Sequence, residues 1–206
     1  MARPRSFDPA KAETSMLDVF WRNGYLATAI PDLSAATGLL PGSLYAAFGN
    51  KDAMFEASLK RYRAWLADEL RTSVTGFEAI ESMLNAIVRI TIEDTERRGC
   101  PMINAIPEGH ALSPEARAMI TDGMNALRRS FRARLTEAAR EIGATIALDE
   151  LEALLFSASV SIRVLGRAGM PATLLRDIAT ATLAAVRQRL GLTVRRQKRS
   201  ARRETK

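Results

Sequence analysis

Apolar residues recur every three or four positions through most of this 206-residue chain, which is the period of a helix with one buried face. The first such stretch predicts a helix over residues 9–23, closed by Gly24, with Met16 and Phe20 on its buried side. The alternation of apolar and polar residues that marks a strand does not extend over a useful length. The pattern therefore predicts an all-α fold.

A segment near the amino terminus contains two short helices separated by a glycine turn. Pro31 and Pro41 suit the first turn of a helix, because proline has no backbone N–H and its φ angle is already helical. Gly38 can take the left-handed conformation that closes the first of the two helices. Leu44 and Phe48, four residues apart, form the buried stripe of the second. We expect a helix-turn-helix whose second helix is exposed on its other side.

The remaining amphipathic stretches predict six more helices. They cover residues 51–73, 77–97, 101–106, 114–142, 149–166 and 171–191. The helix over 149–166 is apolar on more than one face, so it needs cover on two sides. With its successor it can meet the same pair of a second copy in a four-helix interface, which predicts a homodimer. Burial of that surface inside the monomer is the alternative.

Two runs in the first quarter of the chain resemble a known family. The runs ATGLLPGSLY at 36–45 and FGNKDAMF at 48–55 are similar to the DNA-binding region of TetR-type transcriptional repressors. The upstream run FWRNGY at 20–25 fits that family in spacing, and the resemblance extends over about residues 12–60. It implies a regulator, expected to be a repressor, that binds a palindromic double-stranded operator as a homodimer and is released by an unidentified small-molecule effector.

The resemblance and the helical pattern together imply a division of the chain. We expect a helix-turn-helix DNA-binding domain at 1–52, a bridging helix at about 51–73, and a helical ligand-binding and dimerisation domain at 74–192. The helix at 51–73 is the covalent bridge between the two domains. Its tilt is the route by which an event in the second domain would reach DNA.

Six residues are candidates for the DNA interface: Thr28, Gly42, Ser43, Tyr45, Ala46 and Lys51. Gly42 and Ser43 are small enough for the backbone to approach DNA closely. Tyr45 falls off the buried stripe; the resemblance implies that it contacts a phosphate with Thr28 and Lys51, while packing between helices is the alternative. Ala46 can contact a thymine methyl group but cannot hydrogen-bond a base edge. Specificity is therefore expected to depend on few base contacts or on DNA shape.

A ligand pocket is expected among apolar and methionine side chains of the second domain, because methionine adapts to varied apolar ligands. Packing in an ordinary core is the alternative for each of them. Asn104 and Arg163 could orient a polar group of the ligand. The candidates are Met83, Ile87, Met102, Asn104, Met119, Met124, Phe131, Phe156 and Arg163.

Cys100 is the only cysteine. It follows Arg97 and Arg98 and precedes Pro101, where a short helix is expected to begin. Nearby cations and a helix N-terminus both favour a thiolate. A redox or electrophile sensor is one interpretation of this position, and a buried, inert thiol is the other.

Charge is concentrated at the carboxyl end of the sequence. Residues 195–206 contain seven basic residues and one acidic residue, a net charge of +6 out of +7 for the whole chain. A disordered basic tail is expected over 193–206. It either keeps the protein soluble or adds non-specific attraction to phosphates.

Other classes of function find little support in the sequence. No apolar run is long enough to span a membrane, and the amino terminus lacks the apolar core of a secretory signal, so a cytoplasmic protein is expected. The motifs HExxH, CxxC, GxSxG and the Walker glycine-lysine loop are missing, so no enzyme, cofactor or metal site is expected. Two alternatives to the regulator remain: a helical ligand-binding protein without an operator, and a basic protein that packages any duplex.

Overall fold

The first helix begins where the sequence places a capping carboxylate. In the computed structural model, which describes residues 7–143 and 145–192, α1 spans Pro9–Asn23. The Asp8 carboxylate accepts hydrogen bonds from the backbone N–H of Ala10 and Lys11, two groups that have no partner inside the helix. Gly24, with a φ of 82°, closes it.

The described ranges contain nine α-helices and one short 3-10 helix, with no strand among them, which confirms the all-α prediction. After α1 they are α2 (Ile30–Thr37), α3 (Pro41–Phe48), α4 (Lys51–Glu69), α5 (Gly76–Glu93), α6 (Pro101–Ala105), η1 (Ile106–Glu108), α7 (Pro114–Glu141), α8 (Asp149–Arg167) and α9 (Ala172–Arg189). The predicted basic tail lies outside the described residues.

Two helix ends differ from the expectation. α4 ends at Glu69 instead of Ser73, and α5 ends at Glu93 instead of near Arg97. The backbone of Arg97 is left-handed, with a φ of 53°. The loop after α5 is held by contacts with distant elements: Arg98 pairs with Asp18 of α1 at 3.0 Å, a contact across 80 residues of sequence. Capping residues and apolar periodicity near a helix end cannot predict contacts between residues so far apart in the sequence.

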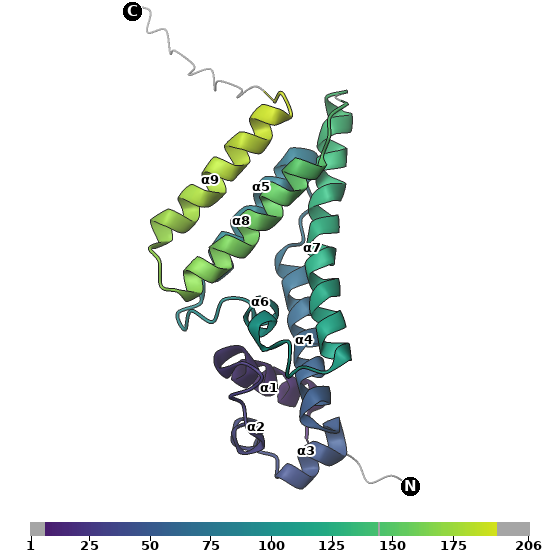
Figure 1. The fold of residues 1–206 in the computed structure, drawn as a ribbon, viewed down its shortest axis with the longest axis vertical. Coiled ribbons are helices and arrows are strands. Elements are labelled where there is room, and N and C mark those ends of the chain that lie inside the picture. Colours follow the sequence, from purple (N-terminus) through teal and green to yellow (C-terminus); the bar gives the residue numbers. More distant parts are fainter. Residues whose placement is uncertain (1–6, 144, 193–206) are drawn as a thin grey trace, which may run out of the picture.

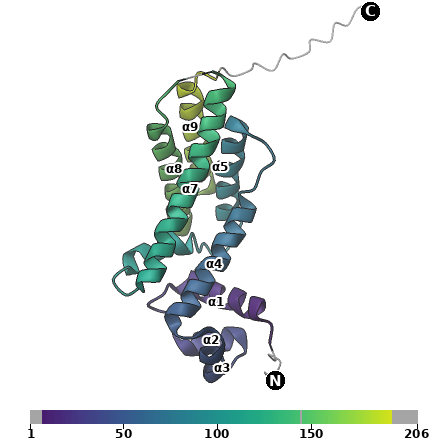
Figure 2. The ribbon, with the colours of Figure 1, turned by 90° about the vertical axis from the view of Figure 1, so that its right-hand side faces the viewer.

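The helices form an elongated molecule with the helix-turn-helix at one end (Figure 1). α1, α2 and α3 form the head, and α4 runs from the head into the body beside the long α7 (Figure 2). α8 and α9 pack against each other and against α5 on the far side of the body. The carboxyl-terminal pair therefore lies far from α3.

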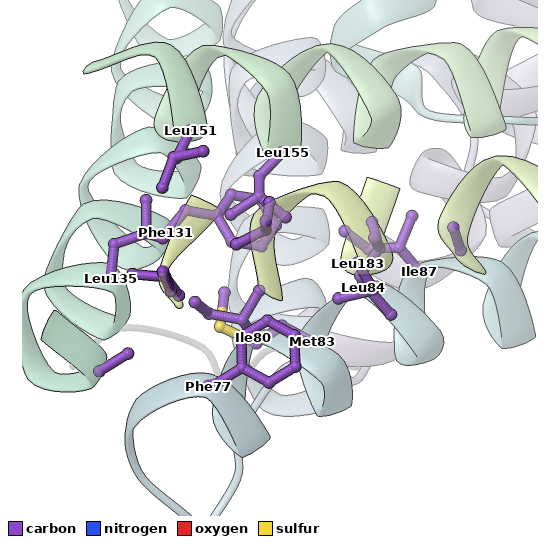
Figure 3. Packing of buried hydrophobic residues seen from close by; sticks show 14 of the residues in the cluster. Phe77, Ile80, Met83, Leu84, Ile87, Phe131, Leu135, Leu151, Leu155 and Leu183 are labelled. Atoms are coloured by element: carbon purple, nitrogen blue, oxygen red, sulfur yellow. The ribbon is translucent and has the colours of Figure 1, made fainter. Parts of the chain in front are cut away.

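Buried side chains divide into two clusters. The upper core joins α5, the later part of α7, α8 and α9 (Figure 3). Its fully buried members include Ile80, Leu84, Ile87, Phe131, Leu135, Leu155, Ile162 and Val186. The lower core joins the head to α4, α6 and the start of α7. Its members include Met16, Phe20, Leu33, Leu44, Met54, Phe55, Leu59, Tyr62, Cys100, Met102, Ala105 and Ile120.

The lower core crosses the predicted division at residues 52 and 74. α6 and the first turns of α7, which belong to the expected second domain, pack with the head. Because closely packed interiors transmit displacement, the head cannot turn without moving α6. The predicted domain boundaries stay a prediction, but the packing ties part of the second domain to the head.

Gly166 offers a test of the packing between α5 and α8. A Cβ added there would overlap the Thr91 Cγ2 methyl group and lie 3.6 Å from Leu175 Cδ1, and Thr91 is held in place because its hydroxyl donates to the Ile87 carbonyl at 2.7 Å. We expect Gly166→Ala to lower the free energy of unfolding by about 1–2 kcal/mol, since overpacking outweighs the gain in helix propensity. Urea unfolding at one fixed protein concentration measures this.

The matched control is Gly42→Ala in α3, where an added Cβ meets no atom within 4 Å. It should leave the free energy of unfolding unchanged or raise it slightly. Equal stability of the two variants would contradict the packing described for Gly166.

Candidate nucleic-acid interface and ligand pocket

The helix pair α2 and α3 is fixed by one buried leucine from each helix and by its turn. Leu33 and Leu44 are both fully buried. Gly38, with a φ of 71°, ends α2 in the left-handed conformation predicted for it. Within the turn the Ser34 hydroxyl donates to the Leu39 carbonyl at 2.5 Å. These contacts set the angle at which α3 leaves the turn.

The outer face of α3 is exposed at the end of the molecule. Gly42, Ser43 and Ala46 are exposed, and Tyr45 keeps 49% of its surface accessible. Tyr45 therefore points outward, as its position off the buried stripe predicted. An added Cβ at Gly42 would meet open space, so this turn offers backbone and small side chains to an approaching partner. Such a helix has the shape of one that enters a DNA groove.

Lys51 lies beside this face at the start of α4. The Asn50 side chain caps the helix by accepting from the Ala53 N–H at 2.9 Å. The Lys51 ammonium lies 4.4 Å from the centroid of the Tyr25 ring, whose hydroxyl donates to Asp52. Partial burial lowers the pKa of Lys51 from its ordinary value, against the opposing effect of Glu108 and Asp52. The aromatic face holds the cation in position.

Thr28 does not fit the predicted interface. Its side chain is buried, with 1% exposed, and its hydroxyl donates to the Gly24 carbonyl at 2.6 Å. The hydroxyl serves the turn between α1 and α2, so Thr28 is not presented to a phosphate in this structure. Sequence position alone placed it correctly near the start of α2 but could not show which way it faces.

Several polar contacts tie the head to the body through α1 and the turn after it, in addition to the Arg98–Asp18 ion pair. The Trp21 indole N–H donates to the Gly99 carbonyl at 3.2 Å. The Glu108 carboxylate of η1 accepts from the backbone N–H of Tyr25 at 2.7 Å and of Leu26 at 3.3 Å. Sequence reasoning missed Glu108, because no local signal relates it to residues 82 and 83 positions earlier.

A pocket with a volume of about 390 Å³ opens between α4 and α7, within the range typical of sites for small organic molecules. Met83 of α5 and Met102 of α6 line it, as predicted for a ligand site. Its other walls include Arg63, Leu66, Leu70, Arg71, Gly123, Leu127, Ser130, Arg134 and Glu137. Sequence reasoning did not identify Arg63 and Gly123 as pocket residues, although an isolated glycine within a helical pattern often has a packing or functional reason.

The other predicted pocket residues lie outside that lining. Ile87 and Phe131 are fully buried in the upper core, Phe156 is half-buried on α8, and Met119 and Met124 pack against the lower core. The Asn104 amide donates to the Arg98 carbonyl at 2.7 Å. Arg163, with 4% exposed, donates to the Tyr62 hydroxyl at 2.6 Å. For most of this set, the packing matches the core alternative.

Cys100 lies in the lower core with 3% of its surface exposed. Tyr62 packs in the same core, and burial is the main reason why the pKa of Tyr62 is well above its usual value. Arg98, expected to favour the thiolate, instead pairs with Asp18, Asp94 and Glu96. The sensor interpretation stays a prediction, and the burial of the sulfur matches the alternative of an inert thiol.

A larger groove, of about 1110 Å³, runs along α1, α4 and α5 on another side of α4. Most of its charged side chains already pair with one another: Arg89 contacts Glu69 and Glu93, and Arg98 contacts Asp18 and Asp94. The smaller pocket is the better candidate for a ligand, since its volume lies within the range typical of small-molecule sites and two of the predicted ligand-site residues, Met83 and Met102, line it.

The described residues meet neither the requirements of a metal site nor those of a membrane-spanning helix. Across 7–143 and 145–192, no three histidine, cysteine, aspartate or glutamate side chains gather as a metal site would need. No helix in those ranges combines the length and apolar character of a membrane span.

Known proteins resemble both the head and the whole chain. The family model described as "Bacterial regulatory proteins, tetR family" matches residues 17–58. The HTH-type transcriptional repressor ComR of Escherichia coli (strain K12) is 36% identical over 107 residues, 50% of this chain and 51% of ComR. The repressor BdcR of the same strain is 31% identical over 119 residues, 56% of this chain and 59% of BdcR. This chain thus spans little more than half the length of the curated relatives that it matches.

A solved structure extends the likeness over nearly the whole molecule. A cysteine mutant of the TetR family transcriptional regulator CifR, complexed with 26-base-pair double-strand operator DNA, matches with a TM-score of 0.77 and 27% identity, over 89% of this chain and 99% of that one. A TetR transcriptional regulator from Chloroflexus aurantiacus matches with a TM-score of 0.73 and 23% identity, over 87% of this chain. The exposed helix-turn-helix and these likenesses together show that the chain belongs to the tetR family of bacterial regulatory proteins.

Proposed function

We propose that this protein is a cytoplasmic transcriptional repressor that binds a palindromic double-stranded operator as a homodimer and is released from it by a small molecule. The observation that carries the proposal is the uncovered face of α3, with Gly42, Ser43 and Tyr45 exposed at the tip of the head. The similar proteins ComR and BdcR are described as repressors. CifR, similar over nearly the whole chain, is complexed with operator DNA.

Within this proposal the residues of the head divide into two roles. Tyr45 and Lys51 contact phosphates, which fixes the position of the head on the duplex without reading its sequence. Gly42, Ser43 and Ala46 lie nearest the base edges, where they offer one hydroxyl and one methyl group. Sequence preference then depends strongly on DNA shape and deformability.

The outer face of α8 and α9 supports the homodimer. Leu154, Val164, Met170 and Leu174 keep 38%, 46%, 42% and 39% of their surfaces exposed. Three of these side chains lie on α8 or α9 and Met170 lies in the turn between them; large apolar side chains left exposed on a helix pair are typical of a protein interface. A two-fold axis through this face would place two heads side by side, as a palindromic operator requires.

Release requires that a ligand prefer one arrangement of the heads over another. The segment formed by α6 and η1 offers a physical connection, because Met102 lines the pocket and Glu108, six residues later, holds the turn after α1. A ligand that displaces Met102 would move this segment and with it the turn that carries α2 and α3. The ligand then shifts the population toward a head spacing that no longer fits the operator.

DNase I footprinting of the purified protein on the DNA upstream of its own gene tests the proposed function. We expect protection of one palindromic site whose half-sites are centred about one helical turn, roughly 34 Å, apart. Competition with unrelated duplex should not remove it at moderate salt. Uniform protection of all sequences would instead support the basic packaging protein, and absence of protection would support the ligand-binding protein without an operator.

Lys51→Gln tests the phosphate contact. The slope of log Kobs against log salt concentration should become shallower by about 0.9 for each Lys51 on a phosphate, thus about 1.8 for a dimer. Electrophoretic mobility shifts between about 50 and 200 mM salt measure the slope. Lys60→Gln is the control, because Lys60 lies on the same helix but lines the groove beside α1. Equal slopes for Lys51→Gln and the parent protein would show that Lys51 contacts no phosphate.

Val164→Glu tests the dimer surface. A carboxylate buried in the proposed apolar interface would be desolvated without a partner, so the protein should sediment as a monomer at micromolar concentration and lose operator binding. Val74→Glu is the control, since Val74 is comparably exposed, at 37%, but lies in the loop before α5. A dimer that survives Val164→Glu would place the interface elsewhere.

A further inference from the structure

The pocket between α4 and α7 lies at the seam between the two cores. Met83 belongs to the upper core and Met102 to the lower core, and both line the pocket. Its wall follows the last turns of α4 from Arg63 and continues past the helix end at Glu69 to Arg71. Leu66, Leu70 and Leu127 complete an elongated apolar wall. The shape suits a flat or extended molecule.

The charges around this pocket do not balance. Three arginines and one glutamate line it. Arg134 is paired with Glu137 at 2.9 Å, and Glu137 also accepts from the Gly76 N–H at 3.2 Å. Arg71 is paired with Asp68 at the exposed end. That leaves Arg63, whose guanidinium has no hydrogen bond or ion pair with any residue that the structure describes, although the side chain is half-buried.

Gly123 shows that Arg63 belongs to the inner end of the pocket. A Cβ added at Gly123 would overlap the Met102 sulfur and lie 3.7 Å from the Arg63 Cδ. The side chains of Met102 and Arg63 therefore meet over this glycine. Glycine inside a helix is less stable than alanine; here it leaves room for the Met102 thioether and the Arg63 stem.

We propose that the pocket binds a small organic carboxylate, with the carboxylate on Arg63 and the apolar part between Met83, Met102 and Leu127. The inference rests on the proposed function in taking this pocket as the effector site, and it adds the chemical class of the effector. An arginine presents its N–H groups in a planar fork that matches the two oxygens of a carboxylate. Apolar walls with one fixed polar group are typical of sites for small organic ligands.

The number of free cations favours a singly charged ligand. One unpaired guanidinium balances one carboxylate, whereas a phosphate monoester, which carries nearly two charges at pH 7, would need a second cation. Arg71 and Arg134 are already neutralised by Asp68 and Glu137. A cationic ligand would face net repulsion at this site.

Isothermal titration calorimetry with two matched pairs of probes tests the proposal on the full chain without DNA. The pairs are 2-naphthoate with 2-naphthamide, and octanoate with octanamide, in which the amide keeps the shape but removes the charge. We expect at least one acid to bind, and its amide to bind at least about tenfold more weakly. Equal binding of acid and amide, or no binding of either acid at millimolar concentration, would overturn the proposal.

Arg63→Gln should weaken binding of the acid by about tenfold or more while leaving the amide unchanged. Arg61→Gln is the matched control, because Arg61 is also half-buried on α4 but lines the groove on another side; it should bind the acid as the parent protein does. Arg63→Lys, which keeps the charge without the fork, should retain part of the affinity. Far-UV circular dichroism checks that each variant is helical. Unchanged affinity in Arg63→Gln would exclude Arg63 as the carboxylate partner.

These experiments distinguish a failure of the proposed carboxylate site from a failure of the proposed repressor function. An acid that binds through Arg63 but does not reduce operator protection supports the carboxylate site and contradicts release by this ligand. A protein that protects its operator but discriminates no acid from its amide supports the repressor and contradicts the carboxylate site.

Discussion

The buried face of α4 is the constraint on which the rest of the structure depends. Phe55, Leu59 and Tyr62 pack in the lower core with the head, and Leu70, two turns further on, packs against the upper core. α4 together with its C-cap residue Leu70 therefore reaches both clusters. The orientation of α3 follows from the orientation of α4 and of α6, which shares the lower core. The head therefore packs directly against the body and is not a separate domain on a flexible linker.

A buried polar contact between α4 and α8 includes one donor that has no partner in the part of the chain that the structure describes. Arg163 of α8 donates one N–H group to Tyr62 of α4, but its Nη2 has no hydrogen-bond partner among the described residues. A buried charged donor without a partner costs free energy that apolar packing must offset. Local opening concentrates in regions of low stability. A contact of this kind suits a protein whose two parts must change their relative position.

Sequence predicted the head closely because its signals are local. Pro31, Gly38 and Pro41 start or end helices by their own backbone chemistry, and the structure places them as predicted. The prediction that Thr28 faces a phosphate does not match the structure, because packing around the turn buries its side chain. The predicted end of α5 was wrong, because contacts distant in sequence hold the loop that follows it.

The pocket was predictable only in part. Helical periodicity identifies which residues face inward, but it does not show whether the space they face is filled. Ile87 and Phe131 face a closely packed core, whereas Met83 and Met102 face a cavity, although all four have the same pattern in sequence. No local signal distinguishes Arg63 from the other charged residues of α4; only the structure shows that its stem lies beside Gly123 and Met102 in the pocket lining.

The central claim is that the shared lower core holds the two heads of a dimer at one fixed separation. Distance measurement by pulsed electron paramagnetic resonance, with a spin label on Ala46→Cys in a Cys100→Ser background, tests it most directly. We predict a single narrow distribution, centred near the helical repeat of DNA at roughly 34 Å, for the free protein. A broad distribution spanning tens of ångströms would show that the heads swing freely and would contradict the account.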